Sequence, residues 1–351
     1  MRPTADRTVA FCQLILKAAV ANHLLPAARW NKQYDFSNEV GYDGRPELAT
    51  TKDGFGMRNV FGTSLRLSLC VLIGSALPVT LSASLDGYVE RWSDFQTQLI
   101  RKEKSFQEGE ALDAAEYPYE RIEYVSDGMT LQALLDTRNI EPATRKPAVI
   151  YLHGGFALSS SELKVTQSFA NAGFIVLAPS WRGENGNPGY FECFLGEVLD
   201  AKSAIRWLAN QDYIDRERIY VFGWSVGGGI ALNLALHDDI PVRLSGSSAG
   251  LYDLDLIKSW ATEDDFIRFP YDYQDEWENY YRLPLYHLQD MVRSHYSYIA
   301  TDDDYALYRE TYDELYPDND TSLRLIELPG NHVDSVPQAV HEFIRLISDH
   351  P

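Results

Sequence analysis

The most constraining feature of this sequence is the pattern Gly-Trp-Ser-Val-Gly at residues 223–227, which sets a serine between two glycines. An apolar run at residues 219–222 precedes it and predicts a buried strand, and residues 225–237 predict a helix. The chain must therefore turn sharply from strand to helix. The glycines leave room for this turn, so we expect Ser225 at a strained, exposed apex beside the N–H groups of the helix N-terminus.

A serine hydroxyl is a weak nucleophile and needs a neighbouring base. His332 is the best candidate, because it lies in a loop directly after residues 323–328, the predicted final strand. Loops at the carboxyl ends of parallel strands are where such sheets place reactive groups. His153 follows the apolar strand predicted at residues 147–152, and we assign it to shaping the neighbouring loop.

The base in turn needs an acid that holds its tautomer. Asp302, Asp303 and Asp304 follow the strand predicted at residues 297–300, and one of them should serve. The resulting chain order is serine, aspartate, histidine, which differs from the orders of the other common triads.

A tetrahedral oxyanion needs two hydrogen-bond donors aimed at it. The backbone N–H of Val226, directly after the serine, is the first candidate. The second should come from the glycine pair that follows His153, where the absence of side chains lets the backbone approach a substrate. We select Gly155 and keep Phe156 as the alternative.

The chain from residue 117 onward alternates between predicted strands and helices. This alternation predicts an α/β fold with a mostly parallel sheet and helices on both faces. Two strands at 121–125 and 130–135 flank a Ser-Asp-Gly turn. Further strands are expected at 147–152, 174–179, 218–222, 242–244, 297–300 and 323–328, and helices at 163–172, 195–210, 225–237 and 336–348.

The first 84 residues differ from the rest of the chain. They carry a net charge of +3, whereas residues 85–351 carry −23, which gives −20 for the whole chain. Residues 57–84 combine a basic start after Met57, an apolar stretch and a run of small residues, which is the layout of a secretory signal peptide. We therefore interpret residues 1–56 as a dubious leader upstream of the true start. A working signal segment predicts an extracytoplasmic location, periplasmic or secreted, and otherwise the protein is expected in the cytoplasm.

Residues 85–118 predict a helix and a linker that lead into the main domain at 119–351. The helix is indicated by Tyr88, Trp92, Phe95 and Leu99, which recur at spacings of four, three and four. Residues 251–290 interrupt the strand–helix alternation with interleaved aromatic and acidic side chains. Such an insertion late in the sheet is interpreted as a cap over its C-terminal edge, with a solvated pair of surface helices as the alternative.

Composition excludes several classes of function. A sequence pI near 4.7 argues against nucleic-acid partners, because the phosphates would be repelled. Three scattered cysteines make neither a disulfide framework nor a zinc ribbon. We expect no metal and no organic cofactor.

Taken together, these motifs resemble the α/β-hydrolase superfamily, and more narrowly the catalytic domain of prolyl oligopeptidases (peptidase S9) and dienelactone-hydrolase-like proteins. The resemblance covers about residues 119–350 and includes Lys-Pro-Ala-Val-Ile-Tyr-Leu-His-Gly-Gly at 146–155 and Pro-Ser-Trp-Arg-Gly at 179–183. In those relatives the acid lies in a His-Gly-x-x-Asp loop. Aligned with residues 300–307, that loop selects Asp304. Ala300 and Thr301 stand where the relatives carry His-Gly, so Asp303 stays as the alternative.

The resemblance implies a serine hydrolase that cleaves an ester or amide bond through an acyl-enzyme. Its catalytic triad would be Ser225, Asp304 and His332, with oxyanion donors at Gly155 and Val226. Oligopeptidases of this type carry a β-propeller before the hydrolase domain, and residues 85–118 are too few for one. A small ester or amide, or a short peptide, is therefore the expected substrate. A non-catalytic binding protein of the same fold and an acyltransferase are the rival functions, and the oligomeric state is left open.

Overall fold

The computed structural model describes residues 88–105, 109–112, 118–252, 268–303 and 308–349. The chain divides into two units, residues 1–84 and 85–351, and everything described belongs to the second. The predictions of a leader at 1–56 and a signal-like segment at 57–84 therefore lie outside the described residues. Among the described helices, none has the length and apolar content that crossing a membrane requires.

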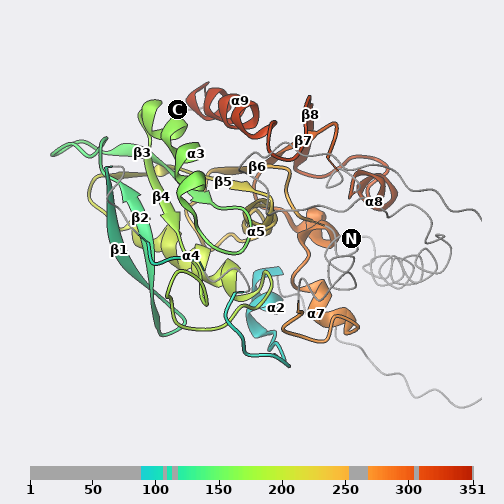
Figure 1. Ribbon diagram of the computed structural model, residues 1–351. Coiled ribbons are helices and arrows are strands. Elements are labelled where there is room, and N and C mark those ends of the chain that lie inside the picture. Colours follow the sequence, from blue (N-terminus) through green and yellow to red (C-terminus); the bar gives the residue numbers. More distant parts are fainter. Residues whose placement is uncertain (1–87, 106–108, 113–117, 253–267, 304–307, 350–351) are drawn as a thin grey trace, which may run out of the picture. The chain divides into compact units, whose positions relative to one another are not determined.

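One eight-stranded sheet forms the centre of the second unit, with strand order β1-β2-β4-β3-β5-β6-β7-β8 (Figure 1). Strands β1, β2 and β4 pair antiparallel, and every pair from β4 through β8 is parallel. This arrangement confirms the predicted fold class. The strands are β1 (Tyr119–Ser126), β2 (Met129–Asp136), β3 (Lys146–Leu152), β4 (Ile175–Pro179), β5 (Ile214–Trp224), β6 (Leu244–Ser248), β7 (His295–Ala300) and β8 (Leu323–Leu328).

Helices cover both faces of this sheet. Helices α3 and α9 cover one face of the sheet, and α4 and α5 cover the other (Figure 1). Side chains that alternate along the strands pack against one or the other pair of helices. The central strands are buried throughout, as parallel strands with two covered faces must be. The helices are α2 (Tyr88–Asp94), α3 (Ser160–Asn171), α4 (Gly196–Ala209), α5 (Val226–Leu234), α7 (Glu276–Tyr280), the 3₁₀ helix η1 (Pro284–Asp290), α8 (Tyr308–Leu315) and α9 (Val336–Asp349).

The predicted β1–β2 hairpin is confirmed. Ser126 pairs with Met129, and Asp127 and Gly128 between them adopt φ values of 48° and 73°. Positive φ at both central positions is the two-residue turn whose twist matches that of the strands, and it favours Asp-Gly. A hydrogen bond of 2.6 Å from Ser126 Oγ to Asp200 Oδ1 fastens the hairpin to α4.

The helix before the main domain is shorter than its apolar spacing predicts. It ends at Asp94, and Phe95 and Leu99 follow in chain without regular secondary structure, where half-buried and exposed residues alternate. The physical reason is a tertiary partner. Glu278 accepts hydrogen bonds from Thr97 Oγ1 (2.9 Å) and Gln98 N (2.7 Å), so the chain follows that carboxylate instead of continuing the helix.

The segment predicted as a cap, 251–290, is described only in part, because residues 253–267 lie outside the described residues. The remainder contains α7 and η1, which pack beside α2; Trp92 Nε1 donates to the backbone oxygen of Tyr281 at 3.1 Å. Coverage of the sheet edge by this segment stays a prediction.

Candidate active site

The junction of β5 and α5 holds Ser225 in an unusual backbone conformation. Its φ is 53° and its ψ −116°, a region that costs a non-glycine residue roughly 1–3 kcal/mol. A side chain at Gly223 would place its Cβ 2.1 Å from the carbonyl oxygen of Gly227, and one at Gly227 would lie 2.1 Å from that of Leu152. The flanking glycines are therefore required by close backbone packing, and the strained turn predicted from the sequence is observed.

Backbone hydrogen bonds fix this turn. Ser225 N donates to the carbonyl of Ser248 at 3.0 Å, and its own carbonyl accepts from Gly229 N (3.2 Å) and Leu251 N (2.9 Å). Only 6% of Ser225 is exposed, so the expected exposed apex is in fact enclosed. The last residue of β6 and the chain that follows it lie close to the turn, because Ser248 and Leu251 both bond the backbone of Ser225.

His332 lies near this turn, in the loop after β8. Trp224, the residue before Ser225, donates its Nε1–H to the carbonyl of His332 at 3.2 Å, and the two rings are 5.7 Å apart. His332 Nδ1 is 2.8 Å from Oδ2 of Asp303, whose side chain is 4% exposed against 21% for the histidine. The structure therefore brings the predicted base and a buried carboxylate to the residue that precedes the serine.

The carboxylate on His332 is that of Asp303, and this differs from the selection of Asp304 made through the resemblance. Asp304 itself lies outside the described residues. Thr301 N and Asp302 N bond to the carbonyls of Leu328 and Gly330, which anchors the loop after β7 to the loop after β8. This anchoring sets the positions of the three consecutive aspartates, and Asp303 is the one whose carboxyl group meets Nδ1 of His332. The hydrogen bond thus favours the alternative that the sequence left open.

The two predicted oxyanion donors lie on neighbouring elements. Val226 is the first residue of α5, and Gly155 follows β3 with a φ of 63°. The contact between Gly227 and the end of β3 shows that the start of α5 lies directly against that strand. Phe156, the alternative donor, is buried, and its carbonyl accepts a hydrogen bond from Ser105 Oγ. The choice between the two N–H groups stays a prediction.

His153, which the sequence placed in the same loop, is fully buried. Its Nδ1 donates to the carbonyl of Gly154 at 2.9 Å, and its Nε2 is 2.8 Å from Oε1 of Glu184. Its ring stacks on that of Trp181 with centroids 3.9 Å apart. Burial by itself lowers the pKa of His153, but the Glu184 carboxylate and the hydrogen bonds outweigh it, and the net effect raises the pKa. Both ring nitrogens are engaged, so this histidine holds the loop.

Sequence reasoning missed several buried charged residues around the site. Arg182 makes two hydrogen bonds to Oδ2 and Oδ1 of Asp200, at 3.0 and 2.9 Å, and a third to Glu192 at 2.7 Å. These bonds fasten the loop after β4 to α4. Glu162 and Glu184 were missed because their partners are distant in sequence or belong to another element. The only local signal was Ser-Ser-Ser-Glu at 159–162, which is typical of a helix start.

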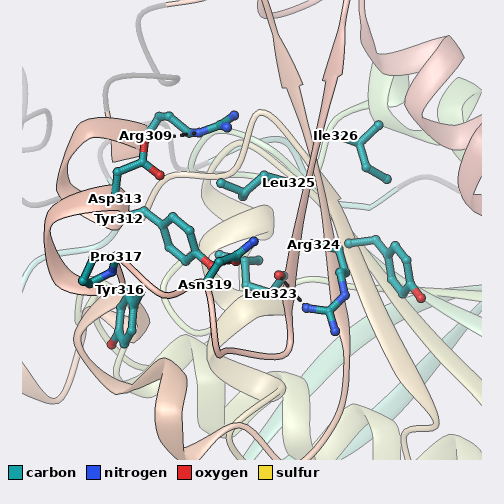
Figure 2. Close-up of a pocket in the computed structure, with 11 residues that line it drawn as sticks. Arg309, Tyr312, Asp313, Tyr316, Pro317, Asn319, Leu323, Arg324, Leu325 and Ile326 are labelled. Atoms are coloured by element: carbon teal, nitrogen blue, oxygen red, sulfur yellow. Dashed lines mark hydrogen bonds and ion pairs between the residues drawn. The ribbon is translucent and has the colours of Figure 1, made fainter.

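Two of the cavities in the described part of the chain differ in position. The larger, about 560 Å³, lies between α8 and β8, where Tyr312 and Asn319 face Leu323 and Leu325 (Figure 2). None of the predicted site residues lines it. The smaller has a volume of about 10 Å³, room for one water, and borders Val226 and Phe156.

Comparison with known proteins agrees with this architecture. A family model described as alpha/beta hydrolase fold matches residues 147–301, and the chain has the α/β-hydrolase fold. The esterase of Pyrobaculum calidifontis superposes with a TM-score of 0.53 at 19% identity, covering 66% of this chain and 85% of that one. A puromycin-hydrolyzing peptidase of Mycobacterium tuberculosis gives 0.53 at 18% identity, covering 66% and 40%. At these identities the likeness shows the fold.

Curated relatives add the narrower resemblance. The chain is 32% identical over 148 residues to the uncharacterized peptidase YtmA of Bacillus subtilis, which covers 41% of this chain and 51% of the relative. It is 26% identical over 230 residues to a probable dipeptidyl-aminopeptidase B of Aspergillus terreus, covering 56% and 24%. The predicted resemblance to prolyl-oligopeptidase-type peptidases is thereby confirmed. The chain spans about half the length of the first of these relatives and a quarter of the second.

Proposed function

We propose that this protein is a serine hydrolase that cleaves a small ester or amide, or a short peptide, through an acyl-enzyme on Ser225. One observation carries the proposal. A strained serine at a strand–helix turn is tied, through Trp224, to a histidine whose Nδ1 bonds a buried Asp303. A serine at such a turn needs a base that is oriented by an acid, and these residues supply that combination.

The mechanism follows from these roles. Ser225 Oγ attacks the substrate carbonyl carbon while His332 Nε2 accepts the hydroxyl proton, and Asp303 stabilises the resulting imidazolium. The N–H groups of Val226 and Gly155 receive the oxyanion. The C–O or C–N bond then breaks, and the imidazolium returns its proton to the leaving group. Water, deprotonated by His332, attacks the acyl-enzyme and releases the acid and Ser225. Each step is proton transfer or acyl transfer, so the chemistry calls for no metal and no cofactor.

The relatives suggest two substrate classes. Curated relatives are named as peptidases, whereas one superposable structure is an esterase. The resemblance in sequence favours peptides, and the superposable esterase favours esters. We therefore propose a parallel screen of p-nitrophenyl esters and of aminoacyl- and prolyl-p-nitroanilides, in which the larger kcat/KM identifies the class.

A fluorophosphonate probe tests the chemistry itself. We expect stoichiometric labelling of the wild type at Ser225, identified by mass spectrometry of the labelled peptide, and no labelling of Ser225→Ala. An unlabelled, folded wild type would contradict catalysis and favour a binding role. Product analysis with an added alcohol or amine separates hydrolysis from acyl transfer.

The location of the protein is a separate proposal. We propose that residues 57–84 direct export, so that the mature chain begins near residue 85 in an extracytoplasmic compartment. N-terminal sequencing of the protein from its natural source tests this, and a mature terminus near Met1 would overturn it.

A further inference from the structure

Glu162 occupies a position whose ordinary local role it does not perform. It is the third residue of α3 after the N-terminal cap residue Ser159, where a glutamate normally reaches back to the cap N–H. Its hydrogen bonds lead elsewhere. Tyr151 Oη donates to Oε2, and Gly154 N donates to Oε1 at 3.3 Å. Ser159 instead shares a hydrogen bond with the hydroxyl of Ser161 at 2.8 Å, and helix capping does not account for the glutamate.

The burial of this carboxyl is energetically unfavourable. Glu162 is 5% exposed, and burial raises its pKa, an effect that the bonds from Tyr151 and Gly154 and the nearby His153 and His332 partly offset. Well-packed apolar side chains often give equal or better stability than buried charge. A role in the site accounts for the glutamate better than a contribution to stability.

The carboxyl contacts the loop that carries the proposed oxyanion donor, and this loop also lies against the residue before Ser225. A Cβ added at Gly154 would lie 3.0 Å from Cε3 of Trp224 and 3.2 Å from Oε1 of Glu162, so this loop is held between the indole and the carboxylate. Gly154 directly precedes Gly155, the proposed oxyanion donor. Trp224 precedes Ser225 and donates to the carbonyl of His332. Glu162 therefore holds the residue directly before the proposed donor, on a loop that also lies against Trp224.

We propose that Glu162 is a positioning residue whose carboxyl oxygen holds the N–H of Gly154 and thereby aims the N–H of Gly155 at the oxyanion. This inference rests on the proposed function. Loss of a whole oxyanion donor costs ~10²–10³ in kcat, and a displaced donor costs less. The interaction is needed only when negative charge develops, so its loss lowers kcat and leaves KM nearly unchanged.

The test compares Glu162→Leu with Glu162→Gln. Glutamine keeps an oxygen for Gly154 N and can donate to Tyr151 Oη, so we expect kcat within about threefold of the wild type. Leucine removes the acceptor, and we expect kcat to fall roughly 10–100-fold with little change in KM. Affinity for a trifluoromethyl ketone, which forms a tetrahedral adduct, should fall by the same factor as kcat/KM. Thr166→Val, a buried change on the same helix that contacts neither loop, is the matched control.

Several results would overturn the proposal. These are an active, folded Glu162→Leu with wild-type kcat, an equal loss in Glu162→Gln and Glu162→Leu, or a loss that appears in KM alone. If Glu162→Leu does not fold, Tyr151→Phe decides: it removes the second bond to the carboxyl, and we expect about a two- to fivefold lower kcat with a parallel loss of ketone affinity. No change in Tyr151→Phe would then count against the role. A wild type that neither turns over substrate nor reacts with the fluorophosphonate probe would instead contradict the proposed function.

Discussion

Two histidine–carboxylate pairs lie at the ends of parallel strands in this molecule, and their separations are both 2.8 Å. His153 with Glu184 follows β3, and His332 with Asp303 follows β8. The first pair is almost fully buried, with exposures of 0% and 2%, whereas the His332 side chain is 21% exposed. In the first pair the second ring nitrogen also bonds a backbone carbonyl.

This difference shows that distance alone does not identify a catalytic base. A buried imidazole whose two ring nitrogens are engaged, one by a backbone carbonyl and one by a carboxyl group, has no ring nitrogen left to accept a proton from serine. A partly exposed imidazole whose Nδ1 is oriented by aspartate presents its Nε2 for proton transfer. The β3 pair is therefore a structural support of the oxyanion loop, and the β8 pair is the proposed catalytic one.

The largest expected effect is a loss of kcat on substitution of His332, which distinguishes the pair after β8 from the pair after β3. His332→Ala should lower kcat by about 10⁴–10⁶-fold, since loss of a triad histidine disables the nucleophile. Its free energy of unfolding should fall by less than that of His153→Ala, because the partial exposure of His332 lets water reach the Asp303 carboxyl group when the imidazole is removed. Steady-state kinetics and urea unfolding measure the two quantities. A variant that keeps a tenth of wild-type kcat would exclude His332 as the base.

The second prediction concerns the acid. Asp303→Asn should lower kcat by roughly 10⁴-fold, because asparagine favours the wrong imidazole tautomer. Asp304→Asn is the matched control and should keep nearly wild-type kcat. The reverse pattern would restore the selection of Asp304 made from the family loop.

The third prediction concerns the buried pair. His153→Ala should reduce the free energy of unfolding by about 3–5 kcal/mol, because it leaves the buried Glu184 carboxyl group without the imidazole and opens a cavity where the ring stacks on Trp181. Urea unfolding monitored by tryptophan fluorescence measures this loss. An unchanged stability together with a large loss of kcat would show that His153 acts in the chemistry.

The smallest expected effect concerns a carboxyl beside the buried pair. Within the described residues, Glu197 Oε2 has no hydrogen-bond partner, and burial raises its pKa from 4.5 to about 8. The folded state therefore binds a proton more tightly than the unfolded state, and stability falls as pH rises through the range 4.5 to 8. The free energy of unfolding lost between pH 5 and pH 9 should be about 2–4 kcal/mol smaller in Glu197→Gln than in the wild type, as measured by urea unfolding. Equal pH dependence in both proteins would contradict a raised pKa of Glu197.

The sequence predicted the sheet, because each strand carries its own local pattern. Residues 323–328 and 147–152 were assigned almost to the residue, since short apolar runs bounded by turn residues leave little choice. The length of α2 was not predictable, because Glu278, which redirects the chain after Asp94, is distant in sequence. The acid was uncertain for a similar reason. Three consecutive aspartates look alike locally, and only the bonds between the loops after β7 and β8 set their register.

The sequence by itself determined the fold class, the strained serine turn and the candidate base. These depend on local steric rules: glycines flank the serine because the backbones of α5 and β3 approach too closely for a Cβ. The tertiary structure decided which carboxylate meets His332, and that both nitrogens of His153 are engaged. It also decided that the Glu162 carboxyl accepts a hydrogen bond from Gly154 N instead of from the N–H of the helix cap. These outcomes depend on contacts between elements distant in sequence, where an ångström of backbone placement determines which polar groups can form a hydrogen bond.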